Sequence, residues 1–144
     1  MNEVTVAPLK LSKKLALPAD VRFMTAGGPK GEFLFATFKD NTVRTFSMQK
    51  ADQLEQLAQI QLAEPEGLLW TAAKGKLLVS EFEKAKRASG VRVLSVGAGG
   101  RSLDREKDGL SADRGTRFPS WCAHKESVYA FDVFKKEILL MELQ

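Results

Sequence analysis

The sequence has one cysteine, one histidine and no long apolar run, and each shortage excludes a class of protein. With one thiol, Cys122, no intrachain disulfide framework can form, and its apolar neighbourhood predicts a buried structural thiol. A single histidine, His124, excludes a histidine-rich metal site. No apolar stretch approaches the roughly 20 residues that cross a bilayer, and no signal-peptide pattern opens the chain. We expect an intracellular protein, cytoplasmic or nuclear, without a membrane partner or a cofactor.

A large excess of charge of one sign is also missing. The 144 residues carry 22 Lys+Arg against 18 Asp+Glu, which gives a net charge of +4 with both signs interspersed. That balance is only mild evidence for a nucleic-acid partner. The contents of 44% hydrophobic and 28% charged residues are typical of a globular protein, and the length suits one domain over residues 1–144.

What the sequence does contain is one pattern repeated three times. A turn, an apolar run, a polar turn and a second apolar run recur at about residues 19–48, 66–96 and 117–143. The runs are rich in β-branched and aromatic residues, which predicts strands. The pairs of apolar runs are 33–38 with 42–48, 77–82 with 91–96, and 128–134 with 138–143.

Three segments lie outside this pattern. Residues 97–116, glycine-rich at first and then densely charged, are predicted to form a long mobile loop. Alternating leucines between residues 9 and 17, together with the apolar residues 4–6, predict outer strands near the N-terminus. Residues 49–59 are rich in Gln, Glu, Ala and Leu, so the sequence leaves open whether they form a short helix.

Repeats of this length indicate a particular architecture. A unit of about 45 residues with three or four strands cannot bury both faces of its own sheet, so such units pack side by side. The stretch Gly28-Pro29-Lys30-Gly31-Glu32-Phe33-Leu34-Phe35-Ala36-Thr37, followed by Asn41-Thr42-Val43-Arg44-Thr45-Phe46, resembles a blade of the lactonase-like and WD-repeat β-propellers. In those families a turn with Pro and Gly precedes a core strand and a polar turn follows it. The resemblance implies an all-β chain of three antiparallel, propeller-like blades.

Three blades make an incomplete ring, because propellers have four to eight. Either the chain is a fragment of a larger protein, or copies associate to complete the ring. The second hypothesis is a symmetric homodimer of six blades, in which the N-terminal strand completes the last blade. The alternative fold is a small antiparallel β-sandwich or barrel, in which the repeats are ordinary hairpins.

Aromatic residues recur at matching places in the repeats. Trp70 and Trp121 occupy one such place, where they either line a binding surface or pack between neighbouring sheets. Phe38, Phe82 and Phe134 occupy another and are predicted to be core residues.

Two carboxylates, Glu81 and Asp132, also occupy roughly matching positions after the core strand. In a propeller of the hydrolase or lactonase type they could converge on a cation, although solvent-exposed strand ends are the commoner place for such residues. No catalytic residue and no metal site is assigned from the sequence.

Basic residues gather in the middle turn, at Lys84, Lys86 and Arg87, and Arg101 follows a run of glycines. They either form a basic surface, which could bind nucleic acid, or are ordinary solvated loop charge. The glycines at 97–100 resemble a phosphate-binding turn but lack the Walker lysine, which favours a flexible linker.

The preferred hypothesis is therefore a non-catalytic scaffold that binds another protein, with a second copy of itself, in a homodimer, as one candidate partner. The alternatives are a fragment of a propeller-type hydrolase or lactonase and a nucleic-acid-binding surface.

Overall fold

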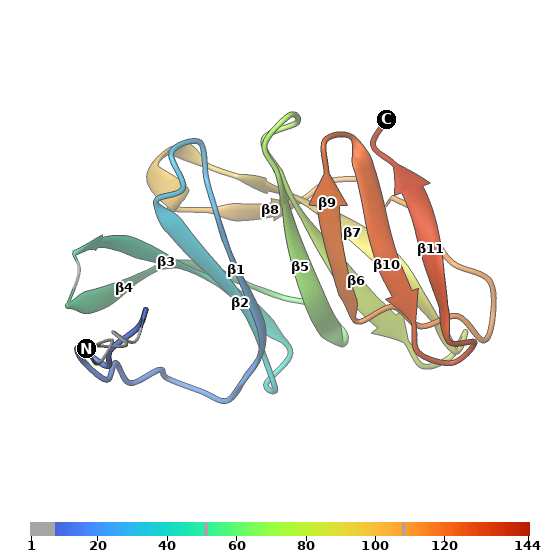
Figure 1. The fold of residues 1–144 in the computed structure, drawn as a ribbon, viewed down its shortest axis with the longest axis horizontal. Helices are drawn as coiled ribbons and strands as arrows, with labels where there is room; N and C mark the ends of the chain where they lie inside the picture. The colour runs from blue at the N-terminus through green and yellow to red at the C-terminus, as the bar shows by residue number, and fades with distance from the viewer. Residues whose placement is uncertain (1–7, 51, 108) are drawn as a thin grey trace, which may run out of the picture.

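Three antiparallel sheets, each built from consecutive hairpins, make up the computed structural model, which describes residues 8–50, 52–107 and 109–144 (Figure 1). Sheet 1 contains β1 (Val21–Gly27), β2 (Phe33–Phe38), β3 (Thr42–Lys50) and β4 (Gln53–Gln61). Sheet 2 contains β5 (Pro65–Thr71), β6 (Lys76–Glu83), β7 (Ala88–Val96) and β8 (Leu103–Arg105). Sheet 3 contains β9 (Ser120–His124), β10 (Ser127–Asp132) and β11 (Glu137–Glu142).

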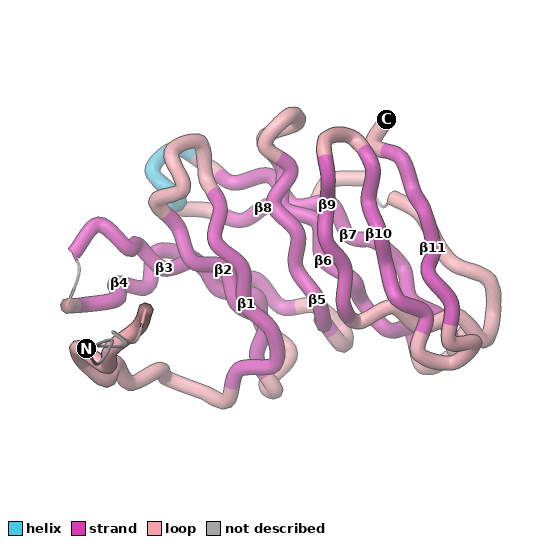
Figure 2. The backbone as a smooth tube through the Cα atoms, in the orientation of Figure 1, coloured by secondary structure: helices cyan, strands magenta, loops and turns pink. Residues whose placement is uncertain are grey.

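Tight turns separate the strands along most of the chain, and a short 3-10 helix, η1 (Ala98–Gly100), lies between β7 and β8 (Figure 2). Residues with positive φ form several of these turns, among them Gly28 at 97° and Asn41 at 66°. Glycine and asparagine are the residues that adopt this conformation most readily. The Gly, Pro and Asn punctuation therefore marks the hairpin ends of sheet 1, whereas Arg87, Lys125 and Lys136 adopt positive φ in later turns.

The sheets stand side by side, and the first strands β1, β5 and β9 are neighbours (Figure 1). Because side chains alternate across a strand, each sheet has a front face toward the next sheet and a back face toward the preceding one. Phe33, Phe35 and Val43 on the front of sheet 1 pack with Leu77 and Val79 on the back of sheet 2. A second cluster joins the front of sheet 2 to the back of sheet 3, and it includes Leu78, Val91, Phe118, Trp121, Ala130 and Leu139.

A third cluster lies on the back face of sheet 1, which no sheet covers. Ala36, Phe38 and Phe46 are buried there under Leu17 and neighbouring residues of the segment that leads into β1. The predicted outer strand between residues 9 and 17 is wrong, because this described segment has no strand structure. Residues 4–6 lie outside the described residues.

Other expectations are also corrected. Residues 53–61 form β4, so the question of a helix at 49–59 is resolved in favour of a strand. β8 lies inside the predicted loop 97–116 and pairs with β7. Three separate sheets replace the alternative of a sandwich or barrel.

Two predicted core residues prove to be accessible. Cys122 is exposed. Phe134 is 46% exposed, whereas Phe38 and Phe82 are buried as expected. Cys122, on β9, lies opposite Tyr129, on a face of sheet 3 that no following sheet covers. Phe134 lies in the turn after β10, where its ring packs edge-on against Phe82 and remains partly accessible.

Candidate functional site

An uncovered apolar face on sheet 3 is the most conspicuous surface of the molecule. Tyr129 and Phe131 on β10 are each 41% exposed, and Ile138 and Leu140 on β11 are each 62% exposed. The strand register places Tyr129 opposite Leu140 and Phe131 opposite Ile138, so the four side chains share one face of the sheet. Large exposed apolar patches mark interaction sites in soluble proteins. We call these four residues the open front of sheet 3.

Backbone hydrogen bonds show which positions of the three sheets are equivalent. The N–H groups of Lys39, Phe82 and Val133 donate to the carbonyls of Asp20, Glu64 and Arg117, at 2.8, 3.0 and 2.8 Å. Each bond ties the end of the second strand to the chain that enters the same sheet. The residues two positions before these three donors are Thr37, Ser80 and Phe131, so these three residues occupy equivalent positions in sheets 1, 2 and 3.

The side chains at this position differ in an informative way. Thr37 Oγ1 donates to the Glu66 carbonyl, and Ser80 Oγ donates to the Phe118 carbonyl, each at 2.7 Å. Both bonds cross to the following sheet and both hydroxyl side chains are fully buried. Phe131 is at the same place in sheet 3 and is partly exposed. An apolar ring there suits a partner that buries it rather than one that accepts a hydrogen bond.

The two carboxylates predicted at matching positions are equivalent, because each directly precedes one of those donors. Asp132 Oδ1 accepts from the N–H groups of Arg117, Phe134 and Lys135 at 3.2, 3.0 and 3.3 Å. Glu81 accepts from Ala63 N and from Arg92 Nε, each at 2.6 Å. Each carboxylate thus binds the chain that enters its own sheet.

Their use as cation ligands stays a prediction. In the described part of the chain, no group of three or more His, Cys, Asp or Glu side chains is placed to hold a metal ion. Both carboxylates are buried and already accept hydrogen bonds from protein groups. Asp132 Oδ2 is buried without a hydrogen-bond partner among those residues.

The two tryptophans occupy the first strands of sheets 2 and 3. Trp70 stacks on Phe35, with ring centroids 5.7 Å apart and an interplanar angle of 15°. Trp121 tilts against Phe118 at the same centroid distance, and its buried Nε1 has no partner within the described ranges. Both are half-buried, so packing between sheets accounts for part of each ring and leaves part accessible.

The basic residues are dispersed. Lys84, Lys86 and Arg87 are exposed in the turn between β6 and β7, where Lys86 Nζ pairs with Glu83 at 3.1 Å. Arg101 lies 3.9 Å from Glu55 after η1. Arg92 on β7 adds nothing to a positive surface, because it is buried and paired with Glu81 and Glu83. The exposed basic residues of the predicted surface are thus Lys84, Lys86 and Arg87 in one turn and Arg101 in another segment.

Sequence reasoning missed the open front of sheet 3. Residues 128–132 alternate in size, with Tyr129 and Phe131 set between Val128, Ala130 and Asp132. A strand with apolar side chains on both faces is typical of one that lies between two neighbours. This apolar pattern on both faces of β10 was the sequence feature that could have predicted an uncovered face on sheet 3.

Comparisons with known proteins support this architecture. No protein-family model and no curated protein sequence matches the chain. A chain in the crystal structure of a mitotic checkpoint complex superposes with a TM-score of 0.66 at 8% identity, covering 85% of this chain and 36% of that one. The β-propeller domain of Cps50 (Swd1) from Myceliophteria thermophila gives a TM-score of 0.58 at 16% identity, covering 84% and 40%.

The fold is therefore a partial β-propeller, and sheets 1 to 3 are its blades. The chain spans less than half the length of each of these solved structures. The three sheets do not close into a ring. Among the residues described, no helix is long and apolar enough to span a membrane.

Proposed function

We propose that the chain is a non-catalytic protein-interaction scaffold and that the open front of sheet 3 binds a second copy of the chain. The observation that carries the proposal is the contrast between the three front faces. The fronts of sheets 1 and 2 are buried by the following sheet, whereas the four large side chains on the front of sheet 3 are 41–62% exposed. Burial of such a face is favourable at roughly 25 cal/mol per Å² of apolar surface.

Packing inside the chain supports a second copy as the occupant. Both internal interfaces join a front face to a back face. Sheet 1 has a back face of the same kind, around Ala36, Phe38 and Phe46, which only a strandless segment covers. Two copies can therefore pack front to back at two places and complete a ring of six sheets. Leu9 and Leu11 in that segment are 86% and 75% exposed, but Leu17 packs on the back face, so association requires the part around Leu17 to move aside.

The edge strand provides a further reason for association. Among the described strands, β11 pairs only with β10, so its outer edge presents unpaired N–H and C=O groups. Unprotected edges favour pairing with another chain.

Light scattering coupled to size exclusion tests the proposal. At micromolar concentration the expected mass is twice the 15.9 kDa of one chain. Leu140→Lys adds a charge to the open front at an exposed position and should give a monomer. Ala72→Lys adds the same charge in the exposed turn after β5 and should leave the dimer intact.

Cys122 offers an independent readout, because it lies opposite Tyr129 on the same face and is exposed in the single chain. The rate of its reaction with a thiol reagent should fall as protein concentration rises, and should stay constant in Leu140→Lys. A wild-type protein that remains a monodisperse monomer, with a thiol rate independent of concentration, would refute self-association.

A further inference from the structure

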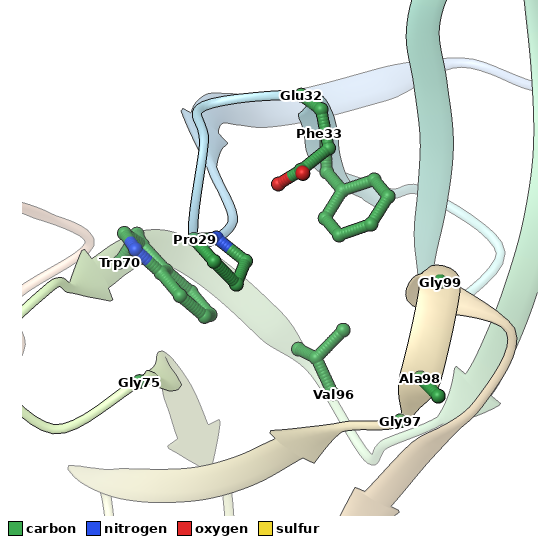
Figure 3. A pocket seen from close by; sticks show the side chains of 9 residues that line it. All are labelled: Pro29, Glu32, Phe33, Trp70, Gly75, Val96, Gly97, Ala98 and Gly99. Carbon is green, nitrogen blue, oxygen red and sulfur yellow. The ribbon is translucent and has the colours of Figure 1, made fainter.

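A cavity lies between sheets 1 and 2, away from the open front of sheet 3. Its volume is about 240 Å³ (Figure 3). Its lining residues are Pro29, Glu32, Phe33, Trp70, Gly75, Val96, Gly97, Ala98 and Gly99. Small-molecule sites commonly measure about 300–1,000 Å³, so this cavity suits a single side chain better than a cofactor.

The aromatic walls are held in place by glycines. A Cβ on Gly27 would lie 2.7 Å from Trp70 Cβ, so glycine lets this ring stack closely on Phe35. A Cβ on Gly100, whose φ is +73°, would lie 2.7 Å from Phe33 Cε1. Packing of this kind fixes both rings before any ligand arrives, which reduces the entropic cost of binding.

Glu32 supplies the only charged side chain among the residues that line the cavity. Its carboxylate projects into the same space as the rings of Phe33 and Pro29 (Figure 3). Oε1 accepts a hydrogen bond from the backbone N–H of Lys30 at 3.1 Å, which orients the group. Glu32 is half-buried, and its carboxylate beside the Phe33 ring attracts a cation through its charge, to which the ring quadrupole adds.

We propose that this cavity binds the basic side chain, lysine or arginine, of a protein partner. The alkyl part of such a side chain packs on Trp70 and Val96, and its charged end meets Glu32. Lys30 and Lys74 are exposed and adjoin lining residues in the sequence, and their positive charge opposes binding. We therefore expect a modest dissociation constant, about 1 mM for an isolated amino-acid derivative.

Backbone amide NMR tests this inference on the intact chain. Nα-acetyl-lysine methylamide and the arginine analogue should shift the amide signals of Gly75, Gly97 and Gly99, and the neutral norleucine analogue should not. Glu32→Gln keeps the side-chain shape, and it should weaken lysine binding about fivefold, as expected for one partly exposed ion pair. Glu126→Gln, at an exposed carboxylate in the turn of sheet 3, is the matched control and should bind as the wild type does.

Three results would overturn the proposal: equal shifts with norleucine, undiminished lysine binding by Glu32→Gln, or no shift with either basic probe. Dispersed spectra of both variants establish that they are folded. Light scattering should give Glu32→Gln the same mass as the wild type, so failure of this site is distinguishable from failure of self-association.

Discussion

Arg117 donates two hydrogen bonds to the Glu66 carboxylate, from Nε to Oε1 at 3.2 Å and from Nη2 to Oε2 at 2.7 Å. The same guanidinium lies over the Phe82 ring, 4.1 Å from its centroid. Hydrogen bonding to Glu66 raises the pKa of Arg117 above its ordinary value, against the opposing effect of partial burial. One side chain thus joins the start of sheet 3 to the first two strands of sheet 2.

Replacing Arg117 should destabilise the junction between sheets 2 and 3. Arg117→Met leaves the buried Glu66 without its ion-pair partner. A fully buried pair costs about 3–5 kcal/mol to break, and we expect about 2 kcal/mol here because the Arg117 side chain is 28% exposed. Arg117→Lys should lose less unfolding free energy, because lysine keeps the positive charge but cannot make both guanidinium hydrogen bonds to Glu66. Urea unfolding measures both, and Arg114→Met, at an exposed position in the same segment, should change stability by less than about 0.5 kcal/mol. Equal losses for the Arg117→Met and Arg114→Met variants would contradict this role.

The hydroxyl bonds between sheets should also contribute measurably. Ser80→Ala removes the buried hydroxyl that donates to the Phe118 carbonyl. Thr37→Val removes the buried hydroxyl that donates to the Glu66 carbonyl. Each should lower the free energy of unfolding by about 1–2 kcal/mol, because the abandoned carbonyl is buried. Ser95→Ala removes a longer, exposed bond of 3.3 Å to the Asp104 carbonyl and serves as the control. If all three variants unfold at the same urea concentration, the inter-sheet bonds are not important for stability.

Stability should fall with acidification in a way that depends on Glu83. Hydrogen bonding from Arg92, with a smaller contribution from Lys86, holds the pKa of Glu83 below its ordinary value of 4.5 despite partial burial. A carboxyl whose pKa is lowered by folding stabilises the native state above its unfolded pKa. That contribution is lost as the pH falls through the lower, folded value.

Urea midpoints measured from about pH 6 down to about pH 3 test this dependence. The wild type should lose stability below about pH 4.5, and Glu83→Gln, less stable at neutral pH, should lose less over that window. Asp40 contributes in the same sense, because a hydrogen bond from Thr42 and the neighbouring Arg44 lower its pKa. Parallel acid profiles for the wild type and Glu83→Gln would refute the assignment to Glu83.

Periodic features of the sequence predicted the fold well. The apolar runs separated by short polar turns located the hairpins, and in sheet 1 the Gly, Pro and Asn residues also marked the turns. Glu81 and Asp132 were placed at matching positions, and the hydrogen bonds of the next residues, Phe82 and Val133, confirm that equivalence.

Features that depend on neighbouring sheets could not be predicted in this way. Cys122 lies in an apolar run, but its burial depends on whether a sheet follows sheet 3. β8 is three residues long and only Leu103 in it is buried, so its charged surroundings concealed it. The cavity residues Glu32 and Trp70 are 38 positions apart in the sequence, and only the packing of sheet 1 on sheet 2 brings them together.

If copies associate front to back, as the sheets inside the chain do, the association through sheet 3 is directional. Each such contact joins two different surfaces rather than one self-complementary patch. Heterologous contacts of this kind either close into a ring or propagate without limit as a filament. The angle between neighbouring sheets therefore decides whether assembly ends at a defined size or continues to polymerise.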